Sequence, residues 1–273
     1  MIADTHNSKF IGSDASVLLT TDRPRRCKGL PRMLSRQRAI LGLLAEAGGT
    51  ATRLETTKWA FLLREETPSR GGSAFFQFLP YKYGPFSFCL YQETTALARD
   101  GYLREVDDRT WSITPSGQTA ARDLEAPVAH DIRHIVGRFQ GKKTNDLFGY
   151  VYDRYQWFTI NCVNDARMTR PEAAPAIYTA GYEGLSVDGF LDGLLRAGVR
   201  RLIDVRNNPV SRRYGFHKST LQRLCGSVGI EYRHFPELGI QSAERQDLDE
   251  PGARQALFDR YQHTTLGSQA DAI

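Results

Sequence analysis

The sequence has few cysteines and no long apolar run, and each absence excludes a class of protein. Its cysteines lie at least sixty residues apart and form no Cys-x-x-Cys pair; they are Cys27, Cys89, Cys162 and Cys225. This spacing gives no disulfide framework, so we expect reduced thiols and a cytoplasmic location. No stretch approaches the roughly eighteen apolar residues of a membrane helix. The first thirty residues also lack the charged stub and apolar core of a signal peptide, so we expect no membrane contact.

Several catalytic and cofactor-binding motifs are missing as well. The sequence contains no Gly-x-x-x-x-Gly-Lys phosphate loop, and no cysteine lies beside a candidate base. His130 and His134 have the four-residue spacing of two zinc ligands on a helix, but no third ligand follows at a suitable distance. Two exposed histidines are therefore the better interpretation. The sequence predicts no metal and no cofactor.

What is present is an ordinary globular composition with an uneven distribution of charge. The 273 residues are 41% hydrophobic and 25% charged, which is typical of one or two folded domains. Between Arg196 and Arg223 there are eight basic residues and one acidic residue, Asp204. From Leu224 to the end there are four basic and eight acidic residues. This segregation predicts a basic surface that binds phosphate groups or contacts the acidic tail of the protein itself.

Residues 1–33 are rich in Ser, Thr, Asp, Arg and Pro and show no sustained hydrophobic period. We expect a mobile basic arm there. Its residues Arg25 and Arg26 could contact a nucleic-acid backbone, and a solvated tail is the alternative.

Residues 34–163 show the order of elements that is typical of a winged helix. Apolar spacing and capping residues predict helices from Ser35, from about Arg53 and over Phe88–Arg99, followed by a hairpin across residues 102–113. A winged helix commonly presents its third helix to the DNA major groove, and Lys82 and Arg99 flank that helix here. The helix itself carries one Glu and one Arg, so protein binding is an equal alternative to DNA binding.

The same region contains the turn Tyr81-Lys82-Tyr83-Gly84-Pro85-Phe86-Ser87, the segments Trp111-Ser112-Ile113-Thr114-Pro115-Ser116-Gly117 and Tyr150-Val151-Tyr152-Asp153-Arg154-Tyr155, and the stretches Leu54–Leu63 and Leu97–Leu103. Through these segments it resembles the YwgA family, which is similar to Panacea-type antitoxin domains. The resemblance covers nearly half of the chain and implies a winged-helix-like α+β domain.

After a linker over residues 164–175, residues 176–273 alternate between strand and helix patterns. Strands are expected over Ala176–Ala180, Val199–Val205 and Ile230–Phe235, with helices between them. Strands separated by helices of this length indicate parallel βαβ units. We therefore predict an α/β protein in which a winged-helix-like α+β domain precedes an incomplete Rossmann-like parallel βαβ domain.

Four polar and apolar blocks follow one another in this second region: Ile177 to Gly184, Leu202 to Pro209, Ser211 to Phe216, and Gly229 to Gly239. Through these blocks, in this order, the region resembles the family called domain of unknown function 488. Members of that family usually continue to a Cys-x-Glu element and a Cys-His-Arg element, and this chain stops at Ile273 before either. The resemblance therefore implies a partial domain in which half of the family's polar signature is missing.

Polar blocks follow each of the three expected strands, and ligands of open parallel sheets bind beyond the carboxyl ends of the strands. Asp204 and Glu237 are the candidate catalytic carboxylates, and an ion pair with Arg206 or Arg212 is the structural alternative for Asp204. The candidate ligand-binding residues have glycine backbones, hydroxyls or cationic groups suited to a phosphate; they are Gly181, Tyr182, Gly184, Arg206, Ser211, Arg212, Arg213 and Lys218.

Three classes of function remain open from the sequence. The leading hypothesis is a nucleic-acid-linked regulatory or bacterial genome-defence protein whose second domain binds a phosphate-bearing ligand. The second is an enzyme that acts on nucleic acid or a nucleotide through Asp204 and Glu237. The third is an antitoxin-like module that binds a protein, or a second copy of itself, without catalysis.

Overall fold

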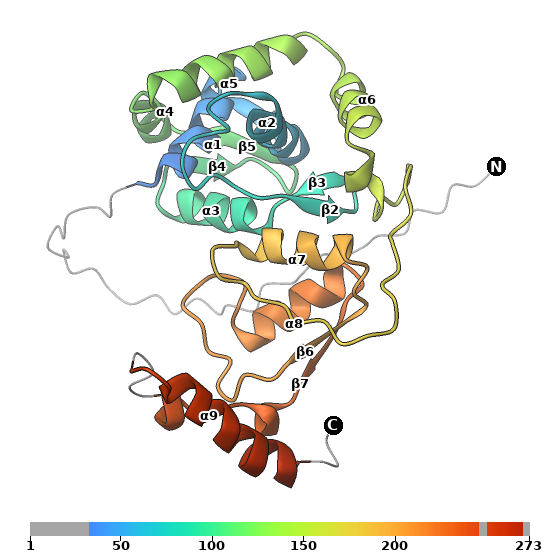
Figure 1. Cartoon of the computed structure of the whole chain (residues 1–273). Coiled ribbons are helices and arrows are strands. Elements are labelled where there is room, and N and C mark those ends of the chain that lie inside the picture. Colours follow the sequence, from blue (N-terminus) through green and yellow to red (C-terminus); the bar gives the residue numbers. More distant parts are fainter. Residues whose placement is uncertain (1–32, 246–249, 270–273) are drawn as a thin grey trace, which may run out of the picture. The chain divides into compact units, whose positions relative to one another are not determined.

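The first half of the chain consists of helices around a small antiparallel sheet (Figure 1). A computed structural model describes residues 33–245 and 250–269, so all of the arm predicted over residues 1–33 except Met33 lies outside the described residues. The sheet has the order β1-β5-β4. The elements up to this sheet's last strand are α1 (Ser35–Glu46), β1 (Thr50–Thr52), α2 (Arg53–Glu66), β2 (Leu79–Tyr81), β3 (Gly84–Phe86), α3 (Phe88–Arg99), β4 (Leu103–Glu105) and β5 (Thr110–Ile113).

Local side-chain caps explain where these helices begin. The hydroxyl of Thr52 accepts a hydrogen bond from the backbone amide of Glu55, whose carboxylate accepts one from the amide of Thr52. This reciprocal pair satisfies amide groups that have no partner inside α2. Ser87 caps α3 with a single hydrogen bond, which its hydroxyl accepts from the amide of Leu90.

Further helices cover α1 and α2 and complete the first core. They are α4 (Pro115–Ala121), α5 (Ala126–Phe139) and α6 (Thr144–Arg154), followed by the 3-10 turn η1 (Gln156–Thr159). Leu43, Phe61, Trp111 and Ile135 are all almost completely buried in this core. The part of the chain described here contains no helix long and apolar enough to span a bilayer.

The second half contains a parallel pair of strands connected through a helix, as the sequence predicted. Its elements are α7 (Val187–Arg196), β6 (Arg201–Asp204), α8 (Lys218–Ser227), β7 (Glu231–His234), the 3-10 turns η2 (Pro236–Leu238) and η3 (Ser242–Arg245), α9 (Ala253–Tyr261) and a π-helical turn, η4 (Gln262–Leu266). The strands pair in register from Arg201 opposite Glu231 to Asp204 opposite His234. The protein is thus a mixed α/β protein with small sheets.

The strand expected over residues 176–180 does not form, and this prediction was wrong for the present structure. The segment has no ladder partner, Ile177 is 99% exposed and Tyr178 is 52% exposed. Alternating apolar residues indicate which side chains a strand would bury, but they do not supply the neighbouring backbone that a strand needs.

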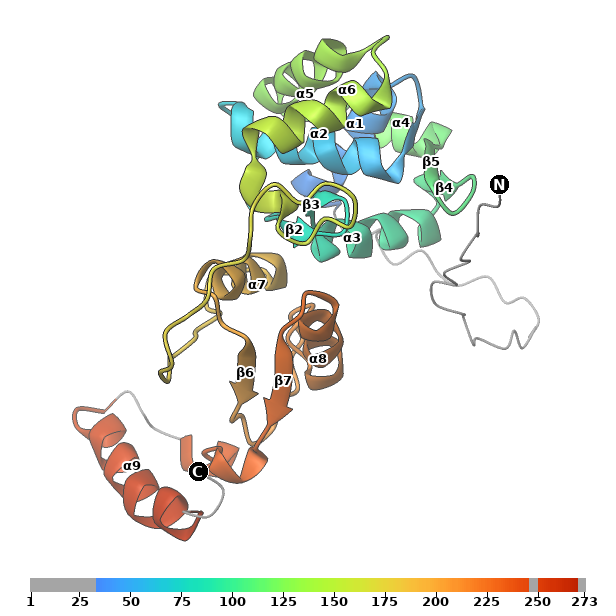
Figure 2. The same cartoon turned by 90° about the vertical axis from the view of Figure 1, so that its right-hand side faces the viewer.

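The two halves share apolar contacts. Leu79 and Phe88 of the first half belong to the core that Val187, Leu191 and Phe216 form in the second. Figure 2 shows α7 between α3 with the β2–β3 hairpin on one side and the β6–β7 strands on the other. The second core therefore includes residues of the first half.

Candidate anion-binding site

The predicted site lies at the carboxyl end of β6, where the carboxylate of Asp204 is almost completely buried. One of its oxygens accepts hydrogen bonds from the backbone amide of Arg206 at 3.1 Å and from Nε of the same residue at 2.8 Å. The other accepts from Nη2 of Arg206 at 2.5 Å and from the hydroxyl of Tyr232 at 2.6 Å. Both oxygens of Asp204 are therefore engaged within the protein.

These contacts determine the charge of the group. Burial would raise the pKa of Asp204, but the hydrogen bonds from Arg206 and Tyr232 outweigh it and lower the pKa. Burial together with the adjacent carboxylate raises the pKa of the Tyr232 hydroxyl. A carboxylate that an arginine keeps ionised is a weak base. In this geometry Asp204 orients Arg206, which is the ion-pair alternative to a catalytic role.

Arg206 braces the loop of residues 205–217, which connects β6 to α8. Its Nη1 donates to the carbonyl of Phe216 at 2.9 Å, and its own carbonyl lies 2.8 Å from Nε2 of His234. Phe216 is fully buried, so its ring packs in the core and is not accessible for stacking with a nucleobase. The start and the end of the loop are thus held by one guanidinium.

Two further predicted residues approach this brace. Nη1 of Arg213 donates to the carbonyl of Tyr182 at 3.2 Å, and the ring of Tyr182 stacks on Phe216 with centroids 4.2 Å apart. The hydroxyl of Ser211 accepts from the amide of Arg213 at 3.1 Å, which forms a local turn. The structure therefore brings Tyr182, Arg206, Ser211 and Arg213 together.

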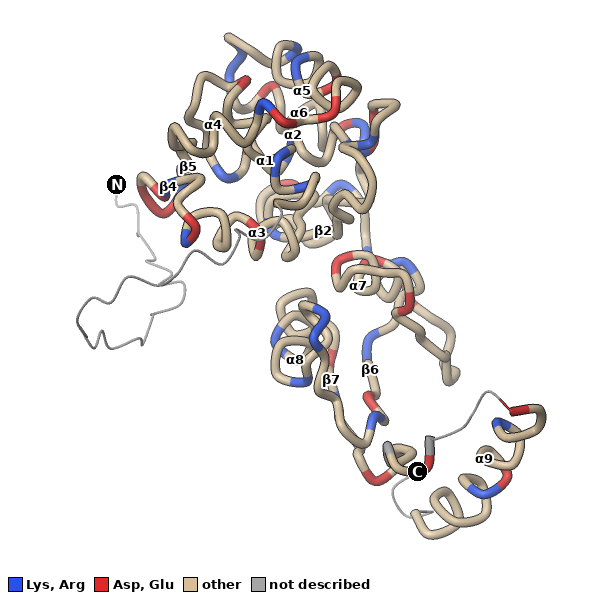
Figure 3. Tube along the Cα trace, turned by 90° about the vertical axis from the view of Figure 1, so that its left-hand side faces the viewer, with Lys and Arg blue, Asp and Glu red and all other residues tan. Residues whose placement is uncertain are grey.

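The other predicted ligand-binding residues are exposed around this group. Arg212 lies on the loop and Lys218 begins α8, where its amide donates to the carbonyl of Pro209 at 3.1 Å. Gly184 has a φ of 75°, a backbone conformation that favours glycine, whereas a Cβ at Gly181 would meet no atom within 4 Å. Figure 3 shows basic positions along β6 and α8 of this half.

Glu237 is exposed on η2, next to the loop. The side-chain amide of Asn207 donates to the carbonyl of Pro236 at 3.3 Å. Gly239 lies so close that a Cβ there would be 2.2 Å from the amide nitrogen of Asn207. These contacts hold the segment that carries Glu237 against the loop, while its side chain faces solvent.

Of the residues predicted to bind nucleic acid, the structure describes Lys82 and Arg99, which lie before the start and at the end of α3. Arg25 and Arg26 lie outside the described residues. Arg99 pairs with Asp100 at 2.9 Å at the end of α3, and Nζ of Lys82 lies 5.9 Å from the ring of Tyr81, before α3 begins. The amino end of α3 itself is occupied by the carboxylate of Asp188, which accepts hydrogen bonds from the amides of Phe88 and Cys89.

Sequence reasoning missed two residues that shape these sites. Tyr232 contacts Asp204, and strand alternation places it on the same side of β7 as the half-buried His234, which was the available signal. Lys58 is fully buried in α2 and donates to the carbonyls of Tyr83 at 2.5 Å and Pro85 at 3.0 Å. Nothing in its local sequence distinguishes it from an exposed helical lysine.

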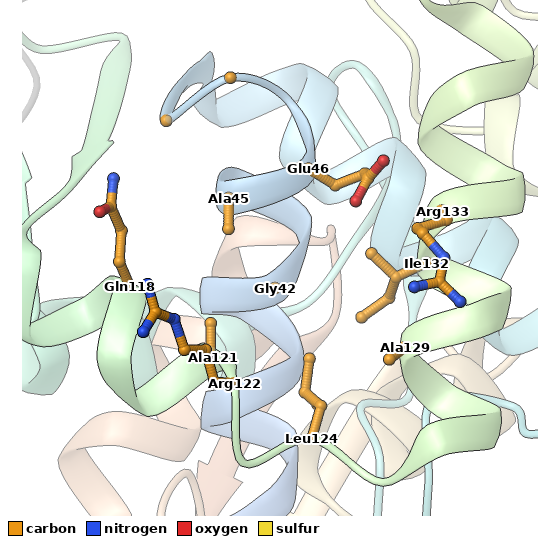
Figure 4. A pocket seen from close by; sticks show the side chains of 12 residues that line it. Gly42, Ala45, Glu46, Gln118, Ala121, Arg122, Leu124, Ala129, Ile132 and Arg133 are labelled. Carbon is orange, nitrogen blue, oxygen red and sulfur yellow. The ribbon is translucent and has the colours of Figure 1, made fainter.

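A pocket of about 360 Å³ lies between α1, α4 and α5, away from the predicted site residues (Figure 4). Its lining combines apolar side chains with Glu46, Arg122 and Arg133. Gly42 permits the close packing there, because a Cβ would lie 2.4 Å from Cδ1 of Leu124. Within residues 33–245 and 250–269 there is no group of three or more His, Cys, Asp or Glu side chains that could hold a metal ion.

Comparison with known proteins bears on the second half. A search of curated proteins gives no match. The model of the family described as "Domain of unknown function DUF488" matches residues 186–273, which include the braced loop and Glu237 but not Gly181, Tyr182 or Gly184. The predicted resemblance of the C-terminal part to this family is thereby confirmed.

Proposed function

We propose that this protein is a nucleic-acid-linked regulatory or genome-defence protein whose second half binds a phosphate-bearing ligand at the loop of residues 205–217. The observation that carries the proposal is the brace formed by Asp204 and Arg206. It fixes a loop that displays Arg212 and Arg213. Guanidinium groups on one short loop repel each other, and a phosphate group among them would relieve that repulsion.

For the first half we propose a winged-helix fold. Three features support it: three helices in the order α1, α2, α3, the sheet order β1-β5-β4, and the β4–β5 hairpin in the position of the wing. Since Asp188 occupies the amino end of α3, nucleic acid would contact exposed basic side chains of this protein, and base reading by that end of α3 is disfavoured.

Fluorescence anisotropy with labelled single- and double-stranded oligonucleotides tests the proposal, with pyrophosphate as a competitor. We expect affinity to fall steeply with salt and to depend little on sequence, because the contacts are with phosphates. The double variant Arg212→Ala/Arg213→Ala should abolish binding.

The matched control is Arg200→Ala/Arg233→Ala, which removes two exposed positive charges from the same half. Those arginines pair with Glu172 and Glu231 instead of lying on the loop. Equal losses in both double variants, or affinity that salt does not change, would contradict a specific site on the loop.

One observation favours a second candidate, antitoxin-like protein binding without catalysis. The amino end of α3, which reads DNA in many winged helices, is buried against α7. Failure of every oligonucleotide and of pyrophosphate to bind would favour this candidate. The enzyme hypothesis remains a proposal that needs Glu237 as a base, since both oxygens of Asp204 are engaged; Glu237→Gln should then abolish turnover of a nucleotide substrate.

A further inference from the structure

The edge of β6 that faces away from β7 is open. Within the described residues β6 pairs with β7 alone. Ile203 in this strand is 52% exposed, and Val205, directly after it, is 44% exposed. An open edge with apolar side chains is a template for another strand.

The segment that precedes α7 is fixed at its amino end, next to the start of β6. The amide of Ala173 donates to the carbonyl of Gly198 at 3.3 Å, and Glu172 pairs with Arg200 at 2.7 Å. Gly198 has a φ of 72°, and a Cβ there would lie 2.5 Å from the nitrogen of Ala173. Residues 172–173 are therefore fixed at the amino end of β6.

The second end of the segment is fixed at the carboxyl end of β6. Tyr182 stacks on Phe216, and its ring centroid lies 5.8 Å from the guanidinium carbon of Arg206, two residues beyond the last residue of β6. The carbonyl of Tyr182 accepts from Arg213. The chain between these anchors must therefore run from one end of β6 to the other, in the direction of β6.

The segment between the two anchors is about as long as the stretch of chain that contains β6. Nine residue steps separate Ala173 from Tyr182, and eight separate Gly198 from Arg206. At a rise of about 3.3 Å per residue, the first stretch is one step longer than the second. This leaves enough chain to lie beside β6, and the composition of Ile177-Tyr178-Thr179-Ala180 is typical of a strand.

We propose that Ile177–Ala180 is a strap that docks on the open edge of β6 as a third parallel strand. The present structure is then the open state, in which Ile177 is exposed to solvent. The helix α7 connects the strap to β6, as expected for two parallel strands. Docking pairs the open edge and places Gly181–Gly184 beside the carboxyl end of β6.

Hydrogen–deuterium exchange on the full chain tests the docking. Among residues 177–180 we expect the alternate amides that point toward β6 to exchange at least about 100-fold more slowly than unprotected amides, at all protein concentrations. Exchange at the unprotected rate overturns the proposal. Protection that appears only at high protein concentration also overturns it, because a second copy would then occupy the edge.

Proline variants give an independent measurement. The amides of adjacent strand residues point to opposite edges, so only one of Thr179 and Ala180 donates toward β6. One of Thr179→Pro and Ala180→Pro should lower the melting temperature by roughly 5–10 °C, and the other by much less. Met168→Pro, in the exposed segment before the first anchor, is the control. Melting temperatures equal to that of the control for both variants contradict docking.

Discussion

The carboxylate of Asp188 accepts a hydrogen bond of 2.9 Å from the hydroxyl of Ser87, so an acid of α7 contacts the residue that caps α3. The same carboxylate accepts from the amides of Phe88 at 2.6 Å and Cys89 at 3.0 Å. In the reverse direction, Oε1 of Gln77 accepts from the amide of Ser186, the capping residue of α7, at 2.9 Å. Each half thus completes a helix terminus of the other.

Removal of this carboxylate should destabilise the whole protein. Asp188→Ala leaves the amides of Phe88 and Cys89 buried without a partner. We expect the free energy of unfolding to fall by roughly 2–4 kcal/mol in urea titrations. Asp100→Ala is the control, because Asp100 is an exposed carboxylate at the other end of α3, and it should change little. Similar midpoints for both variants would contradict the assignment.

Asp188 should also make stability depend on pH. Burial raises its pKa from 3.8 to about 6, despite the hydrogen bonds that favour the ionised form. The folded state therefore binds more protons than the unfolded state between these values, so the contribution to stability is full below about pH 4 and is lost as the pH rises through 6. The loss is on the order of 3 kcal/mol.

The free energies of unfolding of the wild type and of Asp188→Asn are compared between pH 4.5 and 7. Their difference isolates the titration of Asp188 from that of the other carboxylates. The free energy of unfolding of the wild type should decline with pH relative to that of the variant, because the Asn side chain does not titrate. Parallel curves would show that Asp188 has an ordinary pKa in the folded protein.

Lys58 should make the free energy of unfolding change with pH in the opposite direction, at higher pH. Burial lowers its pKa from 10.5 to about 7. The unfolded state then binds more protons between these values, so stability should rise with pH from 7 to 9. Lys58→Met should remove this rise and lower stability through the unpaired carbonyls of Tyr83 and Pro85. Lys218→Met, at an exposed position, should keep the wild-type slope.

The brace of Asp204 and Arg206 should contribute to the stability of the fold, whereas the exposed arginines of the loop should contribute to ligand affinity alone. Arg206→Ala leaves the buried Asp204 carboxylate without its cation and should lower the free energy of unfolding by roughly 3 kcal/mol. Asp204→Ala should reduce both stability and ligand affinity. Arg212→Ala should reduce affinity and leave the melting temperature unchanged, since exposed charges contribute little to folding. Paired thermal melts and anisotropy titrations check all three, and a large loss of stability in Arg212→Ala would contradict the scheme.

Sequence reasoning was most successful where the physical cause is local. Thr52, Ser87 and Ser186 lie within a few residues of the amides they cap, so the helix starts could be predicted. The parallel pairing of β6 and β7 followed from the alternation of strand and helix, and the resemblance to the DUF488 family followed from residue blocks in order.

It was least successful where the partner lies far away in the chain. Asp188 contacts residues about 100 positions before it, and its own neighbourhood reads as an ordinary acidic first turn of a helix. For Asp204, the ion pair with Arg206 was predicted as one of two possibilities, but the hydroxyl of Tyr232 that completes it lies on the next strand. The strap has the composition of a strand, and composition carries no information on whether the edge of β6 is occupied.

The shared core has a consequence for synthesis on the ribosome. Leu79 and Phe88 emerge long before Val187 and Phe216, which complete the core around them. The first half can fold as soon as it emerges, because amino-terminal segments fold first during translation. Until α7 and α8 have been made, its apolar surface at Leu79 and Phe88 lacks its cover. We therefore expect this apolar surface to stay exposed on the nascent chain until the second half has folded onto it.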